Sequence, residues 1–462
     1  MSIQWQARWM VVVLALISTS ACAVNFGKMK PSEVGFYVAD LKTGQEIASH
    51  RADEGMNPAS TMKLLTSYAG LRELGDNYTW KTEFKSDAKV VDGVLQGNLY
   101  WVGSGDPVFD QKDLIEMIHD LNRQGIRGIK GNLVLDRSVW SHVGTAENFE
   151  SDAEAAFTTP PDPQMLAFKV AWLGVDVGVD GKPALKLEPA LPNVVLNTNI
   201  NSRNKGGCRD IRQYLNIKVL GKSINVNGSI PPSCLGKKAF VNVLEGREFA
   251  EQSFLAHWAQ AGNTPPANIV EGKVPKGAKV LVSHLSPSLA EVLMGVNKHS
   301  NNTIARTIFL TLGQEESNSP NTIASAERAM RRSFAQARLF DDEALVIENG
   351  SGLSRRERVT PRYMGQLLKS AYDSPHRSAF VKSLPIAGVD GTLRNRFKNL
   401  GSSLKMKTGT LRNVRALSGY WLPEQNGRNL IIVVMINSPN SGGYLADMDK
   451  LVTELVQTYG QN

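Results

Sequence analysis

The chain has 462 residues, more than one ordinary hydrophobic core accommodates, so two or three domains are expected. Its 42% apolar and 21% charged residues are typical of a folded protein and argue against a disordered chain. The net charge of +8 favours anionic surroundings, but the basic residues are scattered, which favours a solvated surface over a nucleic-acid patch.

The first residues predict export. Residues 1–23 carry one basic residue, Arg8, then the apolar stretch Met10 to Ile17 and the small-residue ending Ala21-Cys22-Ala23. This is typical of a secretory signal peptide, and the apolar stretch is too short to span a bilayer. A lipoprotein cleavage before the cysteine is the weaker alternative, because Thr19 stands where an aliphatic residue is expected. We expect a soluble mature protein in the periplasm.

A hairpin and a helix follow. Residues 34–51 alternate around the turn LKTGQ and predict a β-hairpin. NPAS then precedes MKLLTSYAGLREL, whose leucines have helical spacing and which ends at Gly75. This places Ser60 at the N-terminus of a helix and Lys63 one turn inside it.

The middle of the chain has a different character. Residues 84–267 contain short alternating runs broken by Gly, Pro and Asn, with one clear helix at 110–125. We interpret them as an inserted β-rich region with a nested subdomain at about 90–165. After cleavage of the signal peptide, two cysteines remain in it, Cys208 and Cys234. A disulfide is the simplest state in an oxidising compartment, and two free buried thiols are the alternative.

Helices and strands return after the insertion. Helical spacing recurs over 286–313, with a polar break at Ser300, and again over 358–374. Strand patterns follow at 402–410, 413–422 and 429–438, and a helix closes the chain at 444–460. Residues 24–83 and 268–462 are therefore expected to form one α/β domain.

Ser60 and Lys63 are the first candidate pair. S-x-x-K also occurs at Ser86, Ser202 and Ser402, but only Ser60 opens an apolar helix, where positions i and i+3 share a face. The N–H groups of the first turn would stabilise a developing negative charge. A serine needs a base, and a lysine becomes one when burial or a second cation disfavours its charged form.

Two Lys-Thr-Gly triplets offer that second cation. Lys42-Thr43-Gly44 falls in a hairpin turn, whereas Lys407-Thr408-Gly409 falls inside a strand. A glycine within a strand indicates close approach to the backbone, as by an extended peptide that adds itself to the strand. We favour the second triplet, although simple alternation places Thr408 on the opposite face from Lys407.

A third element is Ser300-Asn301-Asn302. S-x-N is common in this chain, but Ser300 lies in a polar break between two apolar helical runs, where a hydroxyl and an amide can face a cleft. A capping pair for the second helix is the structural alternative. The chain contains no H-E-x-x-H, G-x-S-x-G or Walker motif.

The ordered set Ser60-x-x-Lys63, Ser300-x-Asn302 and Lys407-Thr408-Gly409 resembles the three motifs of penicillin-binding proteins and serine β-lactamases. Longer stretches resemble one family, the D-alanyl-D-alanine carboxypeptidase/endopeptidases, or class C low-molecular-mass penicillin-binding proteins. They are GSGDP (103–107), SPSLAEVLMGVNKHSNN (286–302), NGSGLSRRERVTPRYMGQLL (349–368) and SLPIAGVDGTLRNRF (383–397). The resemblance implies an α/β transpeptidase-like fold, an antiparallel five-stranded sheet flanked by helices, with a large β-rich insertion.

The resemblance also implies roles. Ser60 would be the acylated nucleophile and Lys63 its base, with Ser300 relaying a proton to the leaving amine. Asn302 would hold the substrate backbone and orient Lys63. Lys407 would keep Lys63 deprotonated and, with Thr408 and the neighbouring Gly409, recognise the terminal carboxylate. The N–H groups of Ser60 and Thr410 would form the oxyanion hole.

Two departures from the family pattern stand out. Asn349 replaces the usual Asp, which we interpret as structural, and QMLAFKVAWLGVDV stands in the insertion where a Ser-Val-Asn segment is usual. The expected activity is a serine DD-peptidase on peptidoglycan stem peptides, acylated by β-lactams, with no metal or organic cofactor, no nucleic-acid partner and at most peripheral membrane contact. A β-lactamase on the same scaffold and a silent wall-binding protein are the rivals, and the sequence leaves open the choice between carboxypeptidase and endopeptidase.

Overall fold

The structure is a computed structural model. It describes residues 24–144, 149, 156–314, 322–339, 343–424 and 427–461. The expected signal peptide, 1–23, lies outside these residues. Within the described part, no helix is both long and apolar enough to cross a membrane.

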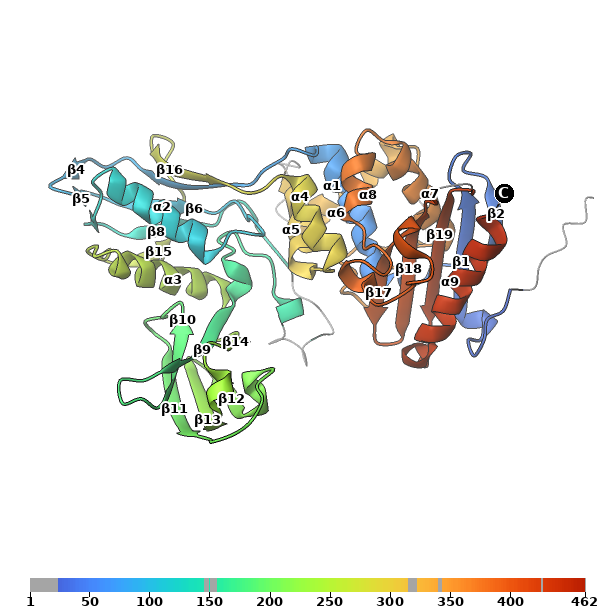
Figure 1. Cartoon of the computed structure of the whole chain (residues 1–462). Coiled ribbons are helices and arrows are strands. Elements are labelled where there is room, and N and C mark those ends of the chain that lie inside the picture. The colour runs from blue at the N-terminus through green and yellow to red at the C-terminus, as the bar shows by residue number, and fades with distance from the viewer. Residues whose placement is uncertain are drawn as a thin grey trace, which may run out of the picture.

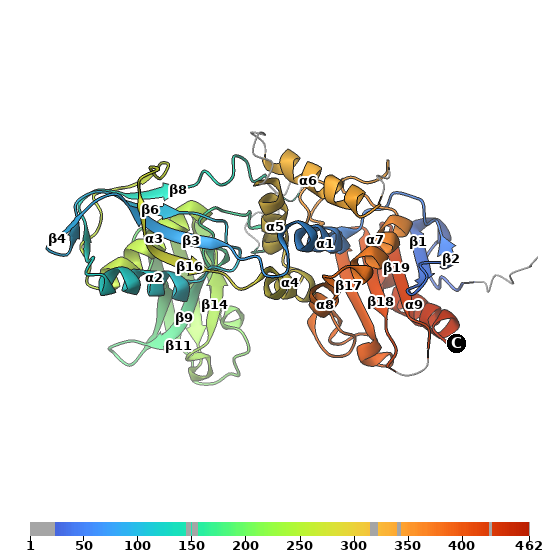
Figure 2. The ribbon, with the colours of Figure 1, turned by 90° about the horizontal axis from the view of Figure 1, so that it is seen from above.

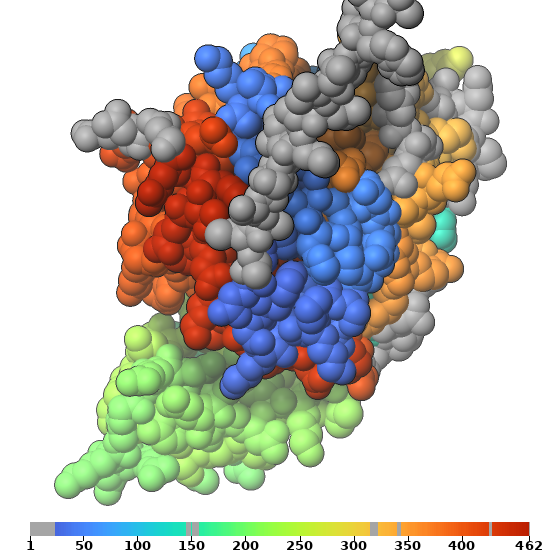
Figure 3. Space-filling model, turned by 90° about the vertical axis from the view of Figure 1, so that its right-hand side faces the viewer, coloured from blue at the N-terminus to red at the C-terminus, as the bar shows by residue number. Residues whose placement is uncertain are grey.

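A five-stranded antiparallel sheet joins the two ends of the chain (Figure 1). In spatial order, its strands are β17 (Leu404–Leu411), β18 (Val414–Trp421), β19 (Leu430–Asn437), β1 (Val34–Asp40) and β2 (Glu46–His50). β1 and β2 form the predicted hairpin, and β1 also pairs with β19, so that Val34 lies opposite Ile436. Figure 3 shows the first described residues and the C-terminal helix side by side on one face.

Helices cover both faces of this sheet (Figure 2). On one face of the sheet, a hydrophobic core contains most of the helices. On the opposite face, a second core packs the sheet against α9 (Leu445–Tyr459). The helices of the first core are α1 (Lys63–Leu74), α4 (Leu289–Lys298), α5 (Asn302–Gln314), α6 (Thr322–Gln336), α7 (Pro361–Asp373) and α8 (Arg377–Ser383). β19 reads LIIVVMIN and is buried on both faces because it lies in the middle of the three layers. The α/β fold with its five-stranded sheet is therefore confirmed.

Local signals set the helix boundaries. α1 ends at Gly75, whose φ of 83° is accessible to glycine at little cost. Ser288 and Glu291 form a reciprocal capping box at the start of α4, and Thr360 caps α7, with Pro361 at its first position.

The middle of the chain forms a second body, joined to the first through two long strands (Figure 1). Its sheet has the order β15 (Ile269–Glu271), β8 (Leu133–Asp136), β6 (Leu99–Val102), β3 (Lys81–Ser86) and β16 (Lys279–Leu285). A small sheet consists of β4 (Val90–Val91), β5 (Val94–Leu95) and β7 (Gly128–Ile129). The helix α2 (Gln111–Arg123) directly precedes β7 in the sequence. The small sheet lies wholly within the predicted subdomain at 90–165, whereas β6 and β8 of the same segment also pair with β3 and β15 in the larger sheet.

A helix that the sequence did not predict lies in this body. The helix predicted at 110–125 is confirmed as α2, but α3 (Gly246–Gln260) is a second helix that buries Phe249, Phe254 and Trp258, so the expectation of a single clear helix was wrong. Its apolar residues do not form a continuous stripe, because Ser253 lies on the buried side while Leu255 is partly exposed. Tertiary packing, more than helical periodicity, stabilises this helix.

Two small sheets complete the insertion. They have the orders β10 (Pro183–Glu188), β9 (Ala171–Val177), β14 (Lys238–Val241), and β11 (Val195–Ser202), β13 (Ser223–Ile230), β12 (Leu215–Leu220). Cys208 and Cys234 are bonded to each other beside the second sheet, with Cα atoms 5.2 Å apart. Cys234 is fully buried in the core that both small sheets share with the larger one.

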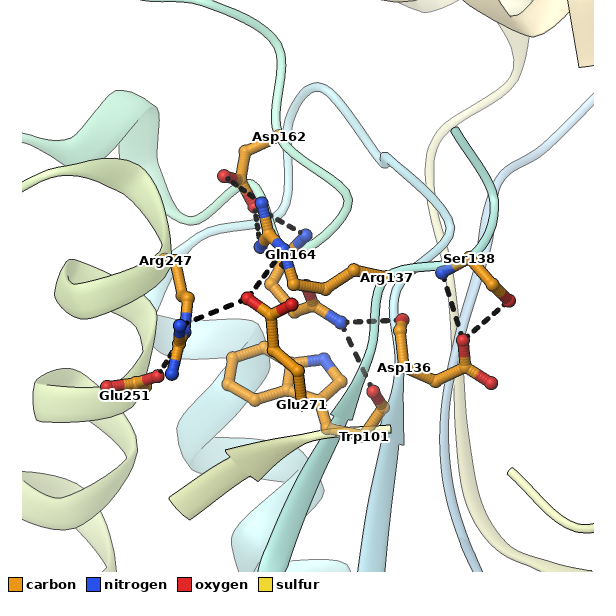
Figure 4. A network of polar contacts seen from close by, with 9 residues as sticks. All are labelled: Trp101, Asp136, Arg137, Ser138, Asp162, Gln164, Arg247, Glu251 and Glu271. Atoms are coloured by element: carbon orange, nitrogen blue, oxygen red, sulfur yellow. Dashed lines mark hydrogen bonds and ion pairs between the residues drawn. The ribbon is translucent and has the colours of Figure 1, made fainter. Parts of the chain in front are cut away.

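A polar network fixes the segment that returns from β8 toward the helical body (Figure 4). Arg137 makes a bidentate pair with Asp162, with nitrogen–oxygen distances of 2.8 and 2.9 Å. Gln164 donates to the backbone carbonyls of Trp101 and Asp136. Glu271 of β15 lies near Arg137 and 3.1 Å from Arg247 of α3. The Arg137–Asp162 pair is of the strong bidentate kind. Together, the contacts of this network anchor the chain just after residues 156–159.

Candidate active site

The local fold brings the Ser60 and Lys63 side chains together. A 3-10 turn, η2 (Ala59–Met62), precedes α1, and the Lys63 N–H donates to the Ser60 carbonyl. Side chains at i and i+3 eclipse in a 3-10 turn. The Lys63 Nζ accordingly lies 3.0 Å from the Ser60 Oγ. Ala59, just before the serine, has φ of 45°, a strained value for a residue with a side chain.

The Lys63 amine is fully buried and has three polar neighbours. Besides the Ser60 hydroxyl, it contacts the Asn302 Oδ1 at 2.6 Å and the backbone carbonyl of Ser351. An amine held by three oxygen atoms has a fixed position and can present its lone pair to the serine when it is neutral. The arrangement fits a base that takes a proton from Ser60.

A second lysine–serine pair comes from the strand and the helix break. The Lys407 Nζ donates to the Ser300 Oγ at 2.8 Å and to the Thr408 carbonyl at 2.8 Å. Ser60, Ser300, Asn302 and Thr410 line the same cleft. The structure therefore assembles the three motifs, which are separated by more than a hundred residues in the chain, around one space.

The break between α4 and α5 presents the S-x-N motif. Ser300 has φ of 57°, and its hydroxyl faces Lys407. Asn301 caps the helix by accepting from the Ile304 N–H at 3.0 Å. Asn302 is thereby left to contact Lys63 through Oδ1 and to donate through Nδ2 to the Phe157 carbonyl. The capping alternative thus applies to Asn301 and not to the motif residues.

The strand β17 forms one wall of the site. A Cβ atom on Gly409 would lie 2.6 Å from the Pro58 carbonyl oxygen. The backbone that closely approaches Gly409 is therefore a segment of this chain itself. The Thr408 hydroxyl donates to the Thr392 hydroxyl at 2.8 Å, and Thr408 is not among the residues that line the cleft. Thr410 does line it.

Burial shifts the titration of both lysines. It lowers the pKa of Lys63 to about 7, and the nearby Glu357 carboxylate opposes this shift. The pKa of Lys407 is well below its ordinary value, chiefly because of burial and then because of the Lys63 charge. The sequence predicts that a second cation deprotonates Lys63, whereas in the structure burial is the main cause of its lowered pKa.

Glu357 is a buried carboxylate near Lys63 that sequence reasoning missed. It is fully buried, and its Oε1 accepts the N–H groups of Glu348, Asn349 and Gly350 at 3.1–3.2 Å. These residues lead directly into Ser351, whose carbonyl accepts from Lys63. Burial raises the pKa of the Glu357 carboxyl. The residue lies within the NGSGLSRRER stretch, but nothing in the sequence pattern indicated its buried charge.

The same loop supports the nucleophile. A Cβ atom on Gly352, which has φ of 80°, would lie 1.9 Å from the Ala59 carbonyl oxygen. Only a glycine allows the loop to pack this closely behind Ser60. The Asn349 Oδ1 accepts from the Ser351 N–H and hydroxyl, and its Nδ2 donates to the Leu353 carbonyl. An aspartate could not make this last donation, so the departure at 349 has a structural use.

Replacing Glu357 with Gln is expected to lower the pH midpoint of the reaction. The glutamine keeps an acceptor for the loop N–H groups but removes the negative charge that favours the Lys63 ammonium. The pKa of Lys63 then falls further, and the midpoint should move by about one pH unit to lower pH. The measurement is the rate of Ser60 acylation by a β-lactam as a function of pH, with Glu348→Gln as the matched control. An unchanged midpoint would show that the carboxylate does not act on Lys63.

The cleft has a volume of about 520 Å³, and the insertion forms part of its wall. Phe149 and Phe157 line it, and the Arg355 guanidinium lies 4.5 Å from the Phe149 ring centroid. The Phe157 and Thr159 carbonyls accept from Asn302 and Thr303 of α5. No sequence signal placed these two phenylalanines near the nucleophile. Within the described residues, no cluster of His, Cys, Asp and Glu has the arrangement of a metal site.

Comparisons with known proteins agree with this geometry. The model of the D-Ala-D-Ala carboxypeptidase 3 (S13) family matches residues 18–457. The D-alanyl-D-alanine carboxypeptidase of Actinomadura sp. (strain R39) is 30% identical over 449 residues, which cover 92% of this chain and 81% of that protein. Penicillin binding protein 4 (dacB) from Haemophilus influenzae superposes with a TM-score of 0.75 at 24% identity, covering 92% of this chain and 96% of the other. The same protein complexed with a novel β-lactam gives a TM-score of 0.71 at 23% identity, covering 93% and 96%. These two likenesses confirm the penicillin-binding protein fold with its β-rich insertion.

Proposed function

This chain belongs to the D-Ala-D-Ala carboxypeptidase 3 (S13) family, and from that premise we propose that it is a serine DD-peptidase that hydrolyses D-Ala-D-Xaa bonds in peptidoglycan peptides. One observation carries the proposal. The buried Lys63 amine, with its pKa lowered to about 7, lies 3.0 Å from the Ser60 hydroxyl in a cleft that it shares with Ser300 and Thr410. A neutral amine beside a hydroxyl is the arrangement that an acyl-transfer nucleophile needs.

Acylation begins at Ser60. Its Oγ attacks the carbonyl carbon of the scissile bond while its proton passes to the neutral Lys63 Nζ. The N–H groups of Ser60 and Thr410 stabilise the oxyanion, a contribution of a few kcal/mol in comparable sites. The C–N bond then breaks, and the proton that Lys63 took from Ser60 is passed on through Ser300, which lies against Lys407, to the leaving amine, so that Lys63 is neutral again. Water then attacks the ester carbon while the neutral Lys63 takes its proton, the ester C–O bond breaks, and Lys63 returns that proton to the Ser60 Oγ, which regenerates the hydroxyl.

The walls of the cleft suit an anionic peptide. Arg355 and Arg412 line it, and no carboxylate does so among the described residues. Phe149 and Phe157 supply apolar surface on the side of the insertion. We place the terminal carboxylate near Lys407 and Thr408; the Thr408 hydroxyl donates to the Thr392 hydroxyl at 2.8 Å. Stem peptides, which carry carboxylates and short apolar side chains, match these features.

The insertion contributes to this site. The predicted limits of 84–267 leave out the start of β3 and all of β15 and β16, which pair within the insertion's sheet. We therefore propose an insertion at 81–285 and a catalytic domain made of 24–80 and 286–462. Its Phe157 carbonyl contacts the Asn302 amide, so it orients a residue that touches Lys63. Export by the signal peptide 1–23 would place the enzyme in the periplasm, where its substrate lies.

β-Lactams are expected to acylate Ser60 and to remain bound, because the opened ring keeps the leaving amine tethered in the cleft. A β-lactamase would instead release the product rapidly, and a silent wall-binding protein would not react. Rapid turnover of a chromogenic cephalosporin supports the first rival, and failure of a fluorescent penicillin to label the protein supports the second.

The deciding experiment is to incubate the purified protein with uncross-linked and cross-linked muropeptides and to identify the products by mass. Release of free D-Ala defines a carboxypeptidase, and conversion of dimers to monomers defines an endopeptidase. Protein pretreated with benzylpenicillin is the control and should form neither product. If the untreated protein also forms neither, the proposed function is wrong.

A further inference from the structure

A second pocket adjoins the catalytic cleft at the far end of β17. Its volume is about 530 Å³, and it lies between the β17–β18 turn, the end of β19 and the loop that follows Ser354. Arg355 and Arg412 line both this pocket and the cleft, so the two spaces share a wall. Arg358, Asn413, Asn437 and Ser438 line the second pocket but not the cleft. We call this space the arginine pocket.

The arginine pocket has an excess of positive charge. None of its lining residues is acidic, and none of its three guanidinium groups forms an ion pair with a described residue. Arg358 donates to the carbonyls of Arg355 and Glu357 at 2.8 Å, and Arg355 donates to the Arg412 carbonyl. By contrast, the neighbouring Arg356 pairs with Glu348 outside the pocket.

Such a cluster is arranged for an oxyanion. Guanidinium groups bind carboxylates through paired, charge-assisted hydrogen bonds, and like charges gathered without a counter-charge repel one another until an anion binds. The side-chain amide of Asn413 and the hydroxyl of Ser438 add polar groups to the same space.

The direction of β17 indicates which part of a substrate would reach the pocket. Under the proposed function, the terminal carboxylate lies near Lys407, and the attacked carbonyl lies between Ser60 and Thr410. A peptide extended along β17 then sends its acyl part past Leu411 and Arg412. Two further residues of an extended chain span about 7 Å, which is enough to leave the cleft and enter the arginine pocket.

We propose that the arginine pocket binds a carboxylate of the substrate's acyl part. The residue that bears this carboxylate is the third one counted back from the attacked carbonyl, where the residue that contains this carbonyl is the first. The inference rests on the proposed function for the identity of the peptide. It assigns Arg358 as a specificity-determining residue that recognises the acyl peptide at a distance from the bond that is cut.

The test compares two synthetic peptides that end in D-Ala-D-Ala and differ at one group. The third residue, counted back in the same way, carries a carboxylate in one peptide and a carboxamide in the other. Binding is measured by calorimetry on Ser60→Ala protein, so that the result does not depend on turnover. We expect the carboxylate peptide to bind about tenfold more tightly, as one charge-assisted contact provides.

Two variants locate the preference. Arg358→Gln should reduce the affinity ratio to about one, and Asn413→Asp, which adds a negative charge of nearly the same shape, should do the same or reverse the ratio. Arg356→Gln is the matched control and should keep the tenfold ratio. Equal affinity of both peptides for the Ser60→Ala protein, or a ratio unchanged in both pocket variants, overturns the proposal. Turnover of the same peptides by the unmodified protein tests the proposed function separately.

Discussion

Replacing Ser60 with alanine is expected to abolish acylation by β-lactams and cleavage of muropeptides, with a loss of at least roughly 10⁴-fold. The Ser60 hydroxyl is the one that Lys63 contacts in the cleft, at 3.0 Å. Ser300 contacts Lys407 instead, so it is not expected to replace the missing nucleophile.

The measurement is the intact mass of the protein after incubation with benzylpenicillin. The unmodified protein should gain one adduct, located on the peptide that contains Ser60, and the variant should gain none. Ser402→Ala is the matched control, because Ser402 opens another S-x-x-K sequence and contacts Glu424 at the surface. An adduct on the Ser60→Ala protein would assign the nucleophile to another residue.

Acylation by a β-lactam is expected to rise with pH through a midpoint of about 7, and Lys63→Met should lower its rate by roughly 10³-fold or more. Only the neutral amine can take the Ser60 proton. Because burial lowers the pKa of Lys63 to about 7, the neutral form predominates above that pH and is lost below it. The rate should therefore fall on the acid side and level off on the alkaline side.

The check is the second-order rate of labelling by a fluorescent penicillin between pH 5 and pH 9, with an independent measurement of folding. Methionine has a similar length but cannot satisfy the Ser351 carbonyl, so some loss of stability is expected as well. Lys405→Met is the matched control, since Lys405 belongs to the same surface S-x-x-K sequence as Ser402. A midpoint near the ordinary lysine value would exclude Lys63 as the base.

The two predictions test the nucleophile and its base separately. Loss of labelling in the Ser60 variant identifies the group that is acylated, whereas the pH midpoint identifies the group that activates it. The Glu357→Gln variant then tests whether the midpoint is set by burial alone or also by the carboxylate beneath the loop. Together, they distinguish a serine peptidase with a lysine base from a protein that merely binds β-lactams.

Much of the fold was predictable because its elements are locally encoded. The hairpin of β1 and β2, the helix α1 with its glycine end, and the strands β17 to β19 lie where alternation and helical spacing indicated. The break at Ser300 was also predictable, since a polar segment between two apolar helical runs interrupts burial. α3 was missed because its buried face is formed by large aromatic residues with a serine between them.

The sequence by itself determined the candidate catalytic residues of this protein: a serine and a lysine one turn apart, a serine and an asparagine at a helix break, and a lysine in a strand. Local spacing is sufficient for these features, because backbone geometry fixes which neighbours share a face. Only the tertiary structure decided which groups surround these residues and shift their pKa values or orient them. Burial of Lys63, the hidden Glu357 carboxylate and the approach of Phe157 from the insertion depend on packing between distant segments. Desolvation and charge act through space, so no pattern along the chain reveals them.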